Sequence, residues 1–238
     1  MPASPPVSPS KAEAVRTMFT RIARRYDLMN SLMTGGRHHA WRRKVAESAA
    51  GAPAGPVLDL ATGTADLALA VRARTPGRFV AGADFSEGML QIGQAKVRAR
   101  RVARLQLLAA DAQALPFRDG AFACVMSAFL LRNLDGLERG LAEMRRVTAR
   151  GGRVVTLDIV RPADPLWGAV FGAYFNHVVP AIGALVAGDR QAYTYLPQSV
   201  DRFVTPDELT ELMEKVGLRD VTHRRFGLGT IALHVGIA

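Results

Sequence analysis

Short apolar runs alternate with longer amphipathic segments between residues 56 and 160. The apolar runs are rich in Val, Leu, Ala and Phe, which is typical of strands buried on both faces of a sheet. They fall at residues 56–61, 78–83, 104–109, 121–128 and 153–159. The intervening segments have helical periodicity and fall near residues 66–74, 87–101 and 135–149. This alternation predicts an α/β fold with a doubly wound, mostly parallel sheet.

Two further runs near the end of the chain, at about residues 219–226 and 229–237, are expected to be strands. A helix is expected before them, because Thr205 suits the N-cap, Pro206 the first helical position and Glu208 a capping box. The two runs predict an antiparallel hairpin at the edge of the sheet. We therefore expect seven strands, with the last strand antiparallel.

The chain before residue 50 predicts two helices. Apolar residues recur at three- and four-residue spacing from Lys11 to about Met33, and a second helix is expected from Trp41 to Ala50. The first helix either packs on the domain or forms a lid that turns its arginines toward membrane headgroups. Residues 1–10, with four prolines and three serines, predict a disordered tail. We expect one domain over residues 11–238.

The 24 residues from 165 to 188 carry no charged side chain apart from His177. That length is enough to span a membrane. Asn176 and His177 at its centre, Pro180 and the need to finish the sheet afterwards argue against a span. Within residues 161–200 we expect a pair of apolar helices that cover a substrate crevice or dip into a membrane interface; plain core packing is the alternative.

Polar and small residues end three successive predicted strands. Gly63 follows the first strand in a tight turn, where it permits a left-handed backbone and close approach of a ligand. Asp84 ends the second strand, where an acidic residue grips a ribose diol, and Asp111 after the third can accept from an adenine amino group. Thr62 and Thr64 are expected to cap the helix that follows the first turn. Together these positions predict a nucleotide site at the carboxyl ends of the strands.

Several motifs resemble those of a known family. The strand-end residues look like those of a class I S-adenosylmethionine-dependent methyltransferase, which has a Rossmann-like fold. The stretch 26–33, Y-D-L-M-N-S-L-M, is similar to the N-terminal signature of the ubiquinone/menaquinone biosynthesis C-methyltransferases. Leu131-Arg132-Asn133 followed by Gly151-Gly152-Arg153 resembles the central signature of that family. Residues 174–188 and 193–196 resemble its insertion.

The resemblance implies S-adenosylmethionine as cofactor and a small-molecule lipid quinol as substrate. The cofactor contacts that it implies are Tyr26, Asp59, Gly63, Thr64, Asp84, Phe85, Met89, Asp111, Ala112, Ser127 and Ala128. Core packing is the alternative role for Met89. The family often has a small hydroxyl residue where Ala128 stands, and here Ser127 precedes that position.

The expected chemistry is methylation of a ring carbon. A quinol that loses a hydroxyl proton pushes charge into its ring, so the site must stabilise an oxyanion and accept a proton. Arg132, with Asn133 beside it, would hold the oxyanion, unless it forms a salt bridge, for example to Asp135. His177 would accept the proton, unless it is a core histidine. Asp158 is either a partner of Arg132 or part of the substrate pocket.

Tyr193 and Tyr195 are further substrate candidates, because a phenol hydroxyl could bond a quinol oxygen. No metal is expected, since His38 and His39 are adjacent and no third ligand is evident. Methylation of another aromatic or lipid metabolite at carbon, oxygen or nitrogen remains the enzymatic alternative. An RNA methyltransferase or a non-catalytic binding module is a more distant one.

Composition indicates the kind of partner surface and the cellular compartment. The 238 residues carry a net charge of +10, yet the arginines are scattered, so an anionic membrane surface is a better partner than nucleic acid. The single Cys124 excludes an internal disulfide and favours a reducing compartment. No run resembles a secretory signal. We expect a cytoplasmic protein in peripheral contact with the membrane face; a homodimer stays open.

Overall fold

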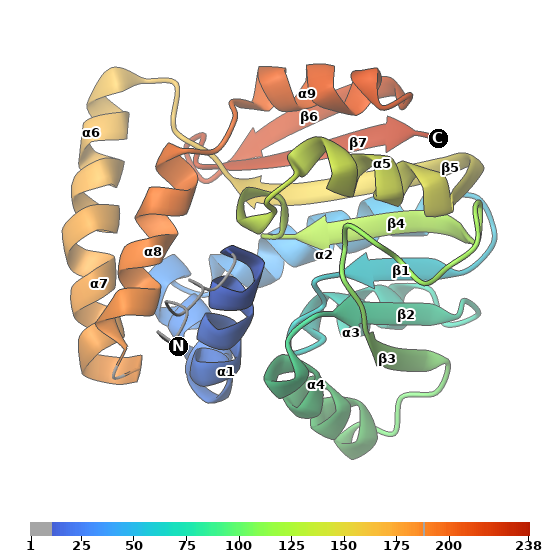
Figure 1. The fold of residues 1–238 in the computed structure, drawn as a ribbon, viewed down its shortest axis with the longest axis horizontal. Helices are drawn as coiled ribbons and strands as arrows, with labels where there is room; N and C mark the ends of the chain where they lie inside the picture. Colours follow the sequence, from blue (N-terminus) through green and yellow to red (C-terminus); the bar gives the residue numbers. More distant parts are fainter. Residues whose placement is uncertain (1–10, 188) are drawn as a thin grey trace, which may run out of the picture.

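The computed structural model describes residues 11–187 and 189–238, so the predicted tail at residues 1–10 lies outside it. Its centre is a seven-stranded sheet in the order β3-β2-β1-β4-β5-β7-β6 (Figure 1). The strands are β1 (Val57–Leu60), β2 (Val80–Asp84), β3 (Leu105–Ala109), β4 (Phe122–Ala128), β5 (Thr148–Ile159), β6 (Arg219–Phe226) and β7 (Ile231–Ile237). The first five are mutually parallel, and β7 is antiparallel to both of its neighbours. The predicted fold class is confirmed.

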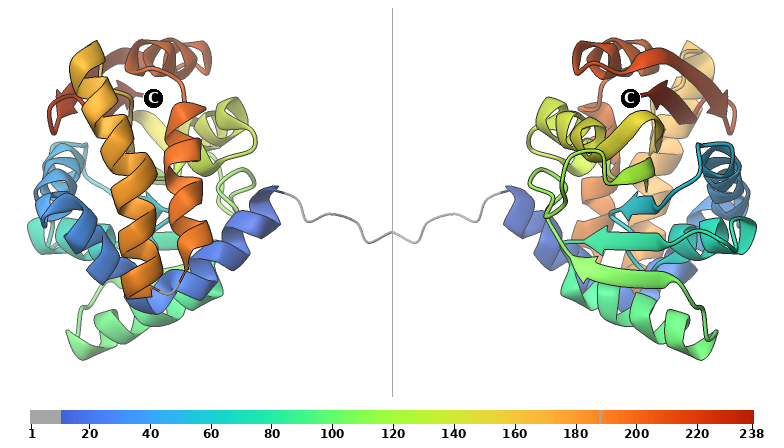
Figure 2. Two further views of the ribbon diagram at one scale, coloured as in Figure 1. Left: turned by 90° about the vertical axis from the view of Figure 1, so that its left-hand side faces the viewer. Right: turned by 90° about the vertical axis from the view of Figure 1, so that its right-hand side faces the viewer.

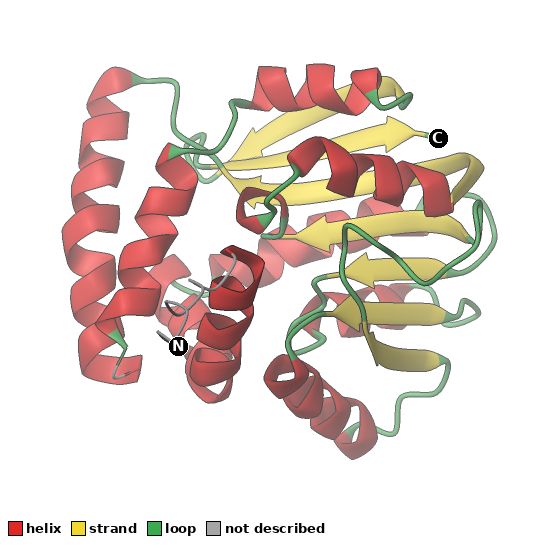
Figure 3. Cartoon of the chain, in the orientation of Figure 1, coloured by secondary structure: helices red, strands yellow, loops and turns green. Residues whose placement is uncertain are grey.

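Helices cover both faces of the sheet (Figure 3). The helices α5 (Leu137–Val147) and α9 (Pro206–Lys215) share one apolar cluster with the sheet. The helices α2 (Arg37–Ala50) and α3 (Asp66–Arg74) share the other. The helix α4 (Glu87–Ala99) contacts β2, β3 and the N-terminal helix α1 (Lys11–Thr34).

The central strand shows why a short, mostly apolar run was informative. All four residues of β1 are buried, and its side chains alternate between the two clusters: Leu58 and Leu60 enter one, Val57 the other. A strand covered on both faces needs apolar residues at successive positions rather than at every second one. The arrowheads of β1 and β4 in Figure 1 point toward one edge of the sheet, where α1 lies. The candidate site is at this edge.

Two element boundaries differ from the prediction. The helix α2 begins at Arg37, not Trp41, because the left-handed residues Gly35 and Gly36 complete the reversal after α1 (Lys11–Thr34). The strand β5 begins at Thr148, five positions before the expected start, where a register shift in its pairing with β4 absorbs Gly151 and Gly152. The prediction for α2 placed its start at the first large apolar residue, and that for β5 after the glycine pair, whereas the backbone hydrogen bonding begins earlier in both.

The apolar stretch after β5 forms a helical hairpin. One long arm runs through α6 (Pro165–Ala173), a π-helical turn (Tyr174–Val178), α7 (Val179–Ile182) and a second π-helical turn (Gly183–Ala187). The return arm is α8 (Arg190–Asp201). The left view of Figure 2 shows the two arms side by side, next to α1. The expected pair of helices is present.

The long arm is exposed for an apolar helix. Pro165–Val186 has the length and composition of a membrane span, and only 17% of its most apolar window is buried within the protein. The inward side chains, among them Phe175 and Val179, join α1 and Met89 of α4 in a third apolar cluster. The hairpin therefore packs on α1 along one side and leaves leucines and valines on the other.

Candidate active site

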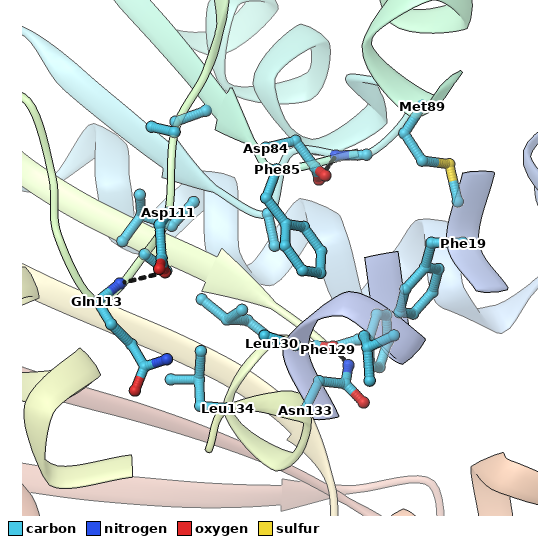
Figure 4. A pocket seen from close by; sticks show the side chains of 18 of the residues that line it. Phe19, Asp84, Phe85, Met89, Asp111, Gln113, Phe129, Leu130, Asn133 and Leu134 are labelled. Atoms are coloured by element: carbon cyan, nitrogen blue, oxygen red, sulfur yellow. Dashed lines mark hydrogen bonds between the residues drawn. The ribbon is translucent and has the colours of Figure 1, made fainter. Parts of the chain in front are cut away.

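A cavity of about 780 Å³ lies at the carboxyl ends of β1, β2 and β3, with α1 as its outer wall. Figure 4 shows Phe85 projecting into it, with Asp111 and Gln113 on one side and Phe19 and Met89 on the other. Eight of the predicted cofactor residues line it: Tyr26, Gly63, Asp84, Phe85, Met89, Asp111, Ala112 and Ala128. Asp59, Thr64 and Ser127 do not.

The turn after β1 holds the carboxylate of Asp84 in place. The backbone N–H of Gly63 donates to Asp84 Oδ2 at 2.8 Å, and that of Ser86 donates to Asp84 Oδ1 at 2.8 Å. Burial raises the pKa of Asp84, and these N–H donors oppose the rise. Each oxygen keeps a lone pair for a further donor, as a ribose diol would require.

Gly63 also leaves room for a ligand. Its φ of +56° lies in the left-handed region, and a Cβ built there would meet no protein atom closer than 4.0 Å. A side chain at this position would take up space in the cavity that Gly63 lines. The residues around this turn therefore fit a nucleoside group that approaches the backbone closely.

The prediction that Thr62 and Thr64 cap α3 is wrong. The N-cap of α3 is Ala65, in a left-handed conformation and without a side-chain cap. Thr62 Oγ1 donates instead to Asp59 Oδ2 at 2.7 Å, and Thr64 Oγ1 to Asp27 Oδ1 at 2.6 Å. Thr64 Oγ1 also accepts from Lys96 Nζ at 3.0 Å, and both threonines precede the N-cap residue Ala65, so neither hydroxyl accepts from the first turn of α3.

Asp59 supports the turn from beneath and does not line the cavity. It is buried, and burial raises its pKa to about 7, opposed by the hydrogen bond from Thr62. Its Oδ1 has no partner among the described residues. Asp59 thus acts through Thr62 on the shape of the turn.

The titration of Asp59 gives a stability prediction. Because the folded-state pKa lies above the unfolded value, the stability that protonated Asp59 contributes is complete below about pH 4 and lost as the pH rises through 7. The variant Asp59→Asn does not titrate there. The free energy of unfolding of the variant minus that of the wild type should therefore rise by up to about 4 kcal/mol between pH 4 and pH 8. Urea titrations across this range measure the difference, and a pH-independent difference would rule out the assignment.

A second cavity, of about 770 Å³, adjoins the first. Both are lined by Phe19, Tyr26, Phe129 and Asn133. The second cavity is otherwise enclosed by α1, α2 and the helical hairpin, and its lining is mainly aromatic and aliphatic. A group bound in one cavity therefore faces a group bound in the other across these four residues.

Arg132 reaches the second cavity from the end of β4. Its Nη1 donates to Asp158 Oδ1 at 2.6 Å, in an ion pair whose side chains are 7% and 2% exposed. Asp158 Oδ2 accepts from the backbone N–H of Leu131 at 2.8 Å. Burial raises the pKa of Asp158, and the Arg132 charge opposes the rise. Of the two roles considered for Asp158, the structure shows the partnership with Arg132, since Asp158 lines neither cavity.

The suggested salt bridge from Arg132 to Asp135 is wrong. Asp135 pairs with Lys11 of α1 at 3.7 Å. Asp135 follows a short 3-10 helix, whereas Asp158 ends the strand β5 that pairs directly with β4. Because neighbouring parallel strands end at the same edge of the sheet, Asp158 lies closer to Arg132 and forms the ion pair with it.

Three buried polar atoms around the second cavity have no partner among the described residues: Asn30 Nδ2, Arg132 Nε and Tyr193 Oη. Unpaired buried polar groups are rare, so a convergent set indicates a ligand that satisfies them. Burial also raises the pKa of Tyr193, which keeps its hydroxyl a neutral donor. Tyr195 Oη donates to Asn133 Oδ1 at 3.3 Å. The two predicted tyrosines thus both lie at this cavity, and Asn30 joins them.

Two histidines differ from expectation. His177 is exposed and lines neither cavity, because Phe175 two positions earlier takes the inward side of the helix. His38, considered only as a metal ligand, is buried in the wall of the second cavity. Burial lowers its pKa to about 4. Its Nδ1 accepts from Arg42, so its Nε2–H donates to Ser31 Oγ at 3.2 Å. Neither His38 nitrogen is left to accept a substrate proton.

The sheet order, the turn at Gly63 and the carboxylates of Asp84 and Asp111 define a class I S-adenosylmethionine-dependent methyltransferase. A crystal structure of such an enzyme from Aquifex aeolicus matches with a TM-score of 0.64 at 16% identity, covering 89% of this chain and 98% of that one. Residues 7–238 match the ubiE/COQ5 methyltransferase family, and the chain belongs to it.

Curated relatives agree over nearly the whole length. A demethylmenaquinone methyltransferase of Thermus thermophilus is 44% identical over 219 residues, which are 92% of this chain and 99% of the relative. A ubiquinone/menaquinone biosynthesis C-methyltransferase of Geobacter sulfurreducens is 41% identical over 225 residues, which are 93% of this chain and 88% of the relative. Family and fold make S-adenosylmethionine the cofactor of this chain.

Proposed function

We propose that this methyltransferase transfers a methyl group to a ring carbon of a reduced prenylated quinone, with demethylmenaquinol as the first candidate. The carrying observation is the apolar cavity beside the cofactor cavity, into which Asn30, Arg132 and Tyr193 bring unpaired polar atoms. A quinol has a flat apolar ring with two oxygens, and this lining complements both features. The names of the curated relatives support the same substrate class.

The side chains of this chain act mainly on the acceptor. When bound, S-adenosylmethionine supplies an electrophilic methyl group. Arg132 keeps its proton, so it stabilises the quinol oxyanion rather than acting as a base. Asn30 Nδ2 and Tyr193 Oη are the donors available to the other oxygen. The apolar walls exclude water, and this exclusion strengthens the pull of Arg132 on developing charge.

Formation of the new carbon–carbon bond requires loss of the ring proton. Both nitrogens of His38 are engaged and His177 is exposed outside the cavity. Among the described residues, neither histidine is therefore placed to take that proton. We propose that this ring proton is lost to bulk solvent as the product leaves the cavity.

Reduction of the acceptor tests the function. Purified enzyme is given methyl-labelled S-adenosylmethionine with a short-tailed demethylmenaquinone, either reduced by dithionite or left oxidised. We expect transfer to the quinol and none to the quinone, since only the quinol has a nucleophilic ring carbon. The benzoquinol precursor of ubiquinone, assayed in parallel, measures ring preference. Cofactor binding without transfer to either quinol would overturn the proposal.

We propose further that α1 is a lid on the cofactor cavity. Lys96 Nζ lies 2.6 Å from Asp27 Oδ2 on α1 and 2.6 Å from Asp66 Oδ1 on α3. Asp27 also accepts from Thr64 in the cofactor turn. On this side the cofactor cavity is lined by four residues of α1: Ala12, Val15, Phe19 and Tyr26. The contacts of Asp27 therefore hold α1 over the cavity.

Breaking the ion pairs of Lys96 should speed exchange of the cofactor. We expect the variant Lys96→Met to release S-adenosylmethionine about tenfold faster, because loss of partly buried ion pairs worth about 1.4 kcal/mol favours the open state. Stopped-flow chase experiments measure the rate. Lys44→Met, which removes an exposed pair with Glu47, is the matched control. Unchanged release from Lys96→Met would show that α1 does not gate the cavity.

The exposed side of the hairpin supports peripheral contact with the cytoplasmic face of a membrane. The strand β5 before the hairpin and the strands β6 and β7 after it belong to one sheet, so the chain enters and leaves the hairpin on one side. A single membrane crossing is incompatible with that arrangement. Exposed Leu166, Val178 and Leu185 offer apolar contacts, and the net charge of +10 favours anionic lipid. Failure to sediment with anionic vesicles would contradict this contact.

A further inference from the structure

A third cavity, an apolar groove of about 930 Å³, continues from the second one toward the surface. The two cavities have five lining residues in common: Met33, Thr34, Trp41, Ile159 and Phe175. The groove then runs between α6 and the turn that joins β6 to β7. The groove therefore lies between the proposed ring site and the outside of the protein.

The lining of the groove is mainly apolar, although Trp167 Nε1 is a buried donor without a partner among the described residues. Its far part is formed by Trp167, Val170, Phe171, Tyr174, Leu228 and Ile231. The Tyr174 hydroxyl is occupied, because it donates to the carbonyl of Met33 at 2.9 Å. Thr230 Oγ1 donates to the carbonyl of Gly227 at 2.7 Å. Arg37, the charged residue of the described lining, is exposed.

The mouth of the groove carries two exposed apolar residues on different elements. Val170 of α6 is 51% exposed, and Leu228 of the β6–β7 turn is 70% exposed. Leu228 also has a φ of +57°, between Gly227 and Gly229, which are left-handed too. Leucine is costly in that conformation, where glycine or asparagine would fit without strain. An exposed, strained leucine at a groove mouth is explained when its side chain contacts an apolar ligand.

The alternative exit from the second cavity has a charged and polar lining. The cavity between α6 and α8 shares only Phe175 with the second cavity. Its lining includes the charged residues Arg161 and Asp201 and the amide of Asn176. An isoprenoid chain in that cavity would remove these groups from water without bonding them.

We propose that the groove between α6 and the β6–β7 turn binds the polyprenyl tail of the quinol and guides it from the ring site to the surface. This inference rests on the proposed function and extends it to a specific tail site. Val170 and Leu228 contact the tail as it leaves the protein, beside the exposed apolar side of the hairpin. A tail that is embedded in lipid can then keep its far end in the bilayer while the ring is methylated.

Two variants test the groove in different ways. Val170→Glu places a carboxylate at the mouth, on an exposed position that tolerates charge in the free enzyme. Leu228→Gly removes the apolar contact and relieves the left-handed strain, so it should raise thermal stability while weakening the tail site. Ala173→Glu is the control, since Ala173 is exposed on α6 like Val170 and does not line the groove.

The measurement is kcat/KM for demethylmenaquinols with a single isoprene unit and with several units, in detergent. For Val170→Glu and Leu228→Gly we expect about a tenfold loss with the long tail and less than about twofold with the short one. Ala173→Glu should lower neither. Equal losses on both tails, or none on the long tail, would overturn the groove alone. A wild-type enzyme that methylates neither quinol would overturn the proposed function and the groove with it.

Discussion

Replacing Arg132 by methionine should lower the turnover of quinol methylation by about a hundredfold to a thousandfold, which is typical for loss of one oxyanion donor. Arg132 is buried at the wall of the acceptor cavity, and its Nε is a donor without a partner in the described chain. It does not line the cofactor cavity. Affinity for S-adenosylmethionine should therefore stay within about threefold of wild type. Single-turnover rates and calorimetric titration separate the two effects.

The ion pair with Asp158 complicates that variant and also supplies its control. Removing Arg132 alone leaves a buried carboxylate without its cation, which costs about 3–5 kcal/mol of stability. The double variant Arg132→Met/Asp158→Asn removes both charges, so it should recover most of the stability but none of the turnover. Recovery of turnover in the double variant would show that Arg132 serves only to neutralise Asp158.

Replacing Asp84 by alanine should weaken S-adenosylmethionine binding by about tenfold to a hundredfold, the cost of losing hydrogen bonds to a charged group. The carboxylate lines the cofactor cavity and is oriented by the N–H groups of Gly63 and Ser86. Calorimetric titration measures the affinity. Glu87→Ala, next to the same turn but outside the cavity lining, is the control and should change affinity little.

Asp84→Ala also removes two acceptors from the turn, so stability is measured alongside affinity. We expect a folded variant with a cooperative unfolding transition, because the sheet around β2 stays packed. Unchanged affinity would refute the ribose assignment for Asp84. Loss of affinity only where the variant is already unfolded would refute it as well.

The strand pattern was readable from sequence because strands covered on both faces are rich in apolar residues at successive positions, as in β4. The carboxyl ends of parallel strands meet at one edge, so Gly63, Asp84 and Asp111 could be placed together before any coordinates. The sequence signal for the start of α9 was also contained within that element, because Thr205 and Glu208 form the predicted capping box. Signals contained within one element, or repeated along neighbouring strands, were therefore sufficient for the fold and the cofactor cavity.

Side-chain partners were less predictable where distant segments compete for them. Thr64 looks like a cap locally, but Asp27 from α1, 37 positions away, takes its hydroxyl. Asn30 entered the acceptor cavity with α1, and only the folded position of that helix shows it. The inward side of the long helical arm was also hidden, because an apolar run of that length has no periodic polar face to orient His177.

The position of the transferred methyl group tests the central claim most directly. Enzyme, demethylmenaquinol and S-adenosylmethionine with a deuterated methyl group are incubated, and the quinone product is analysed by mass spectrometry and NMR. The account predicts the label on the ring carbon, with both quinol oxygens unmethylated. A label on oxygen, or on neither position while the enzyme still binds its cofactor, would contradict the assignment of the second cavity as a quinol C-methylation site.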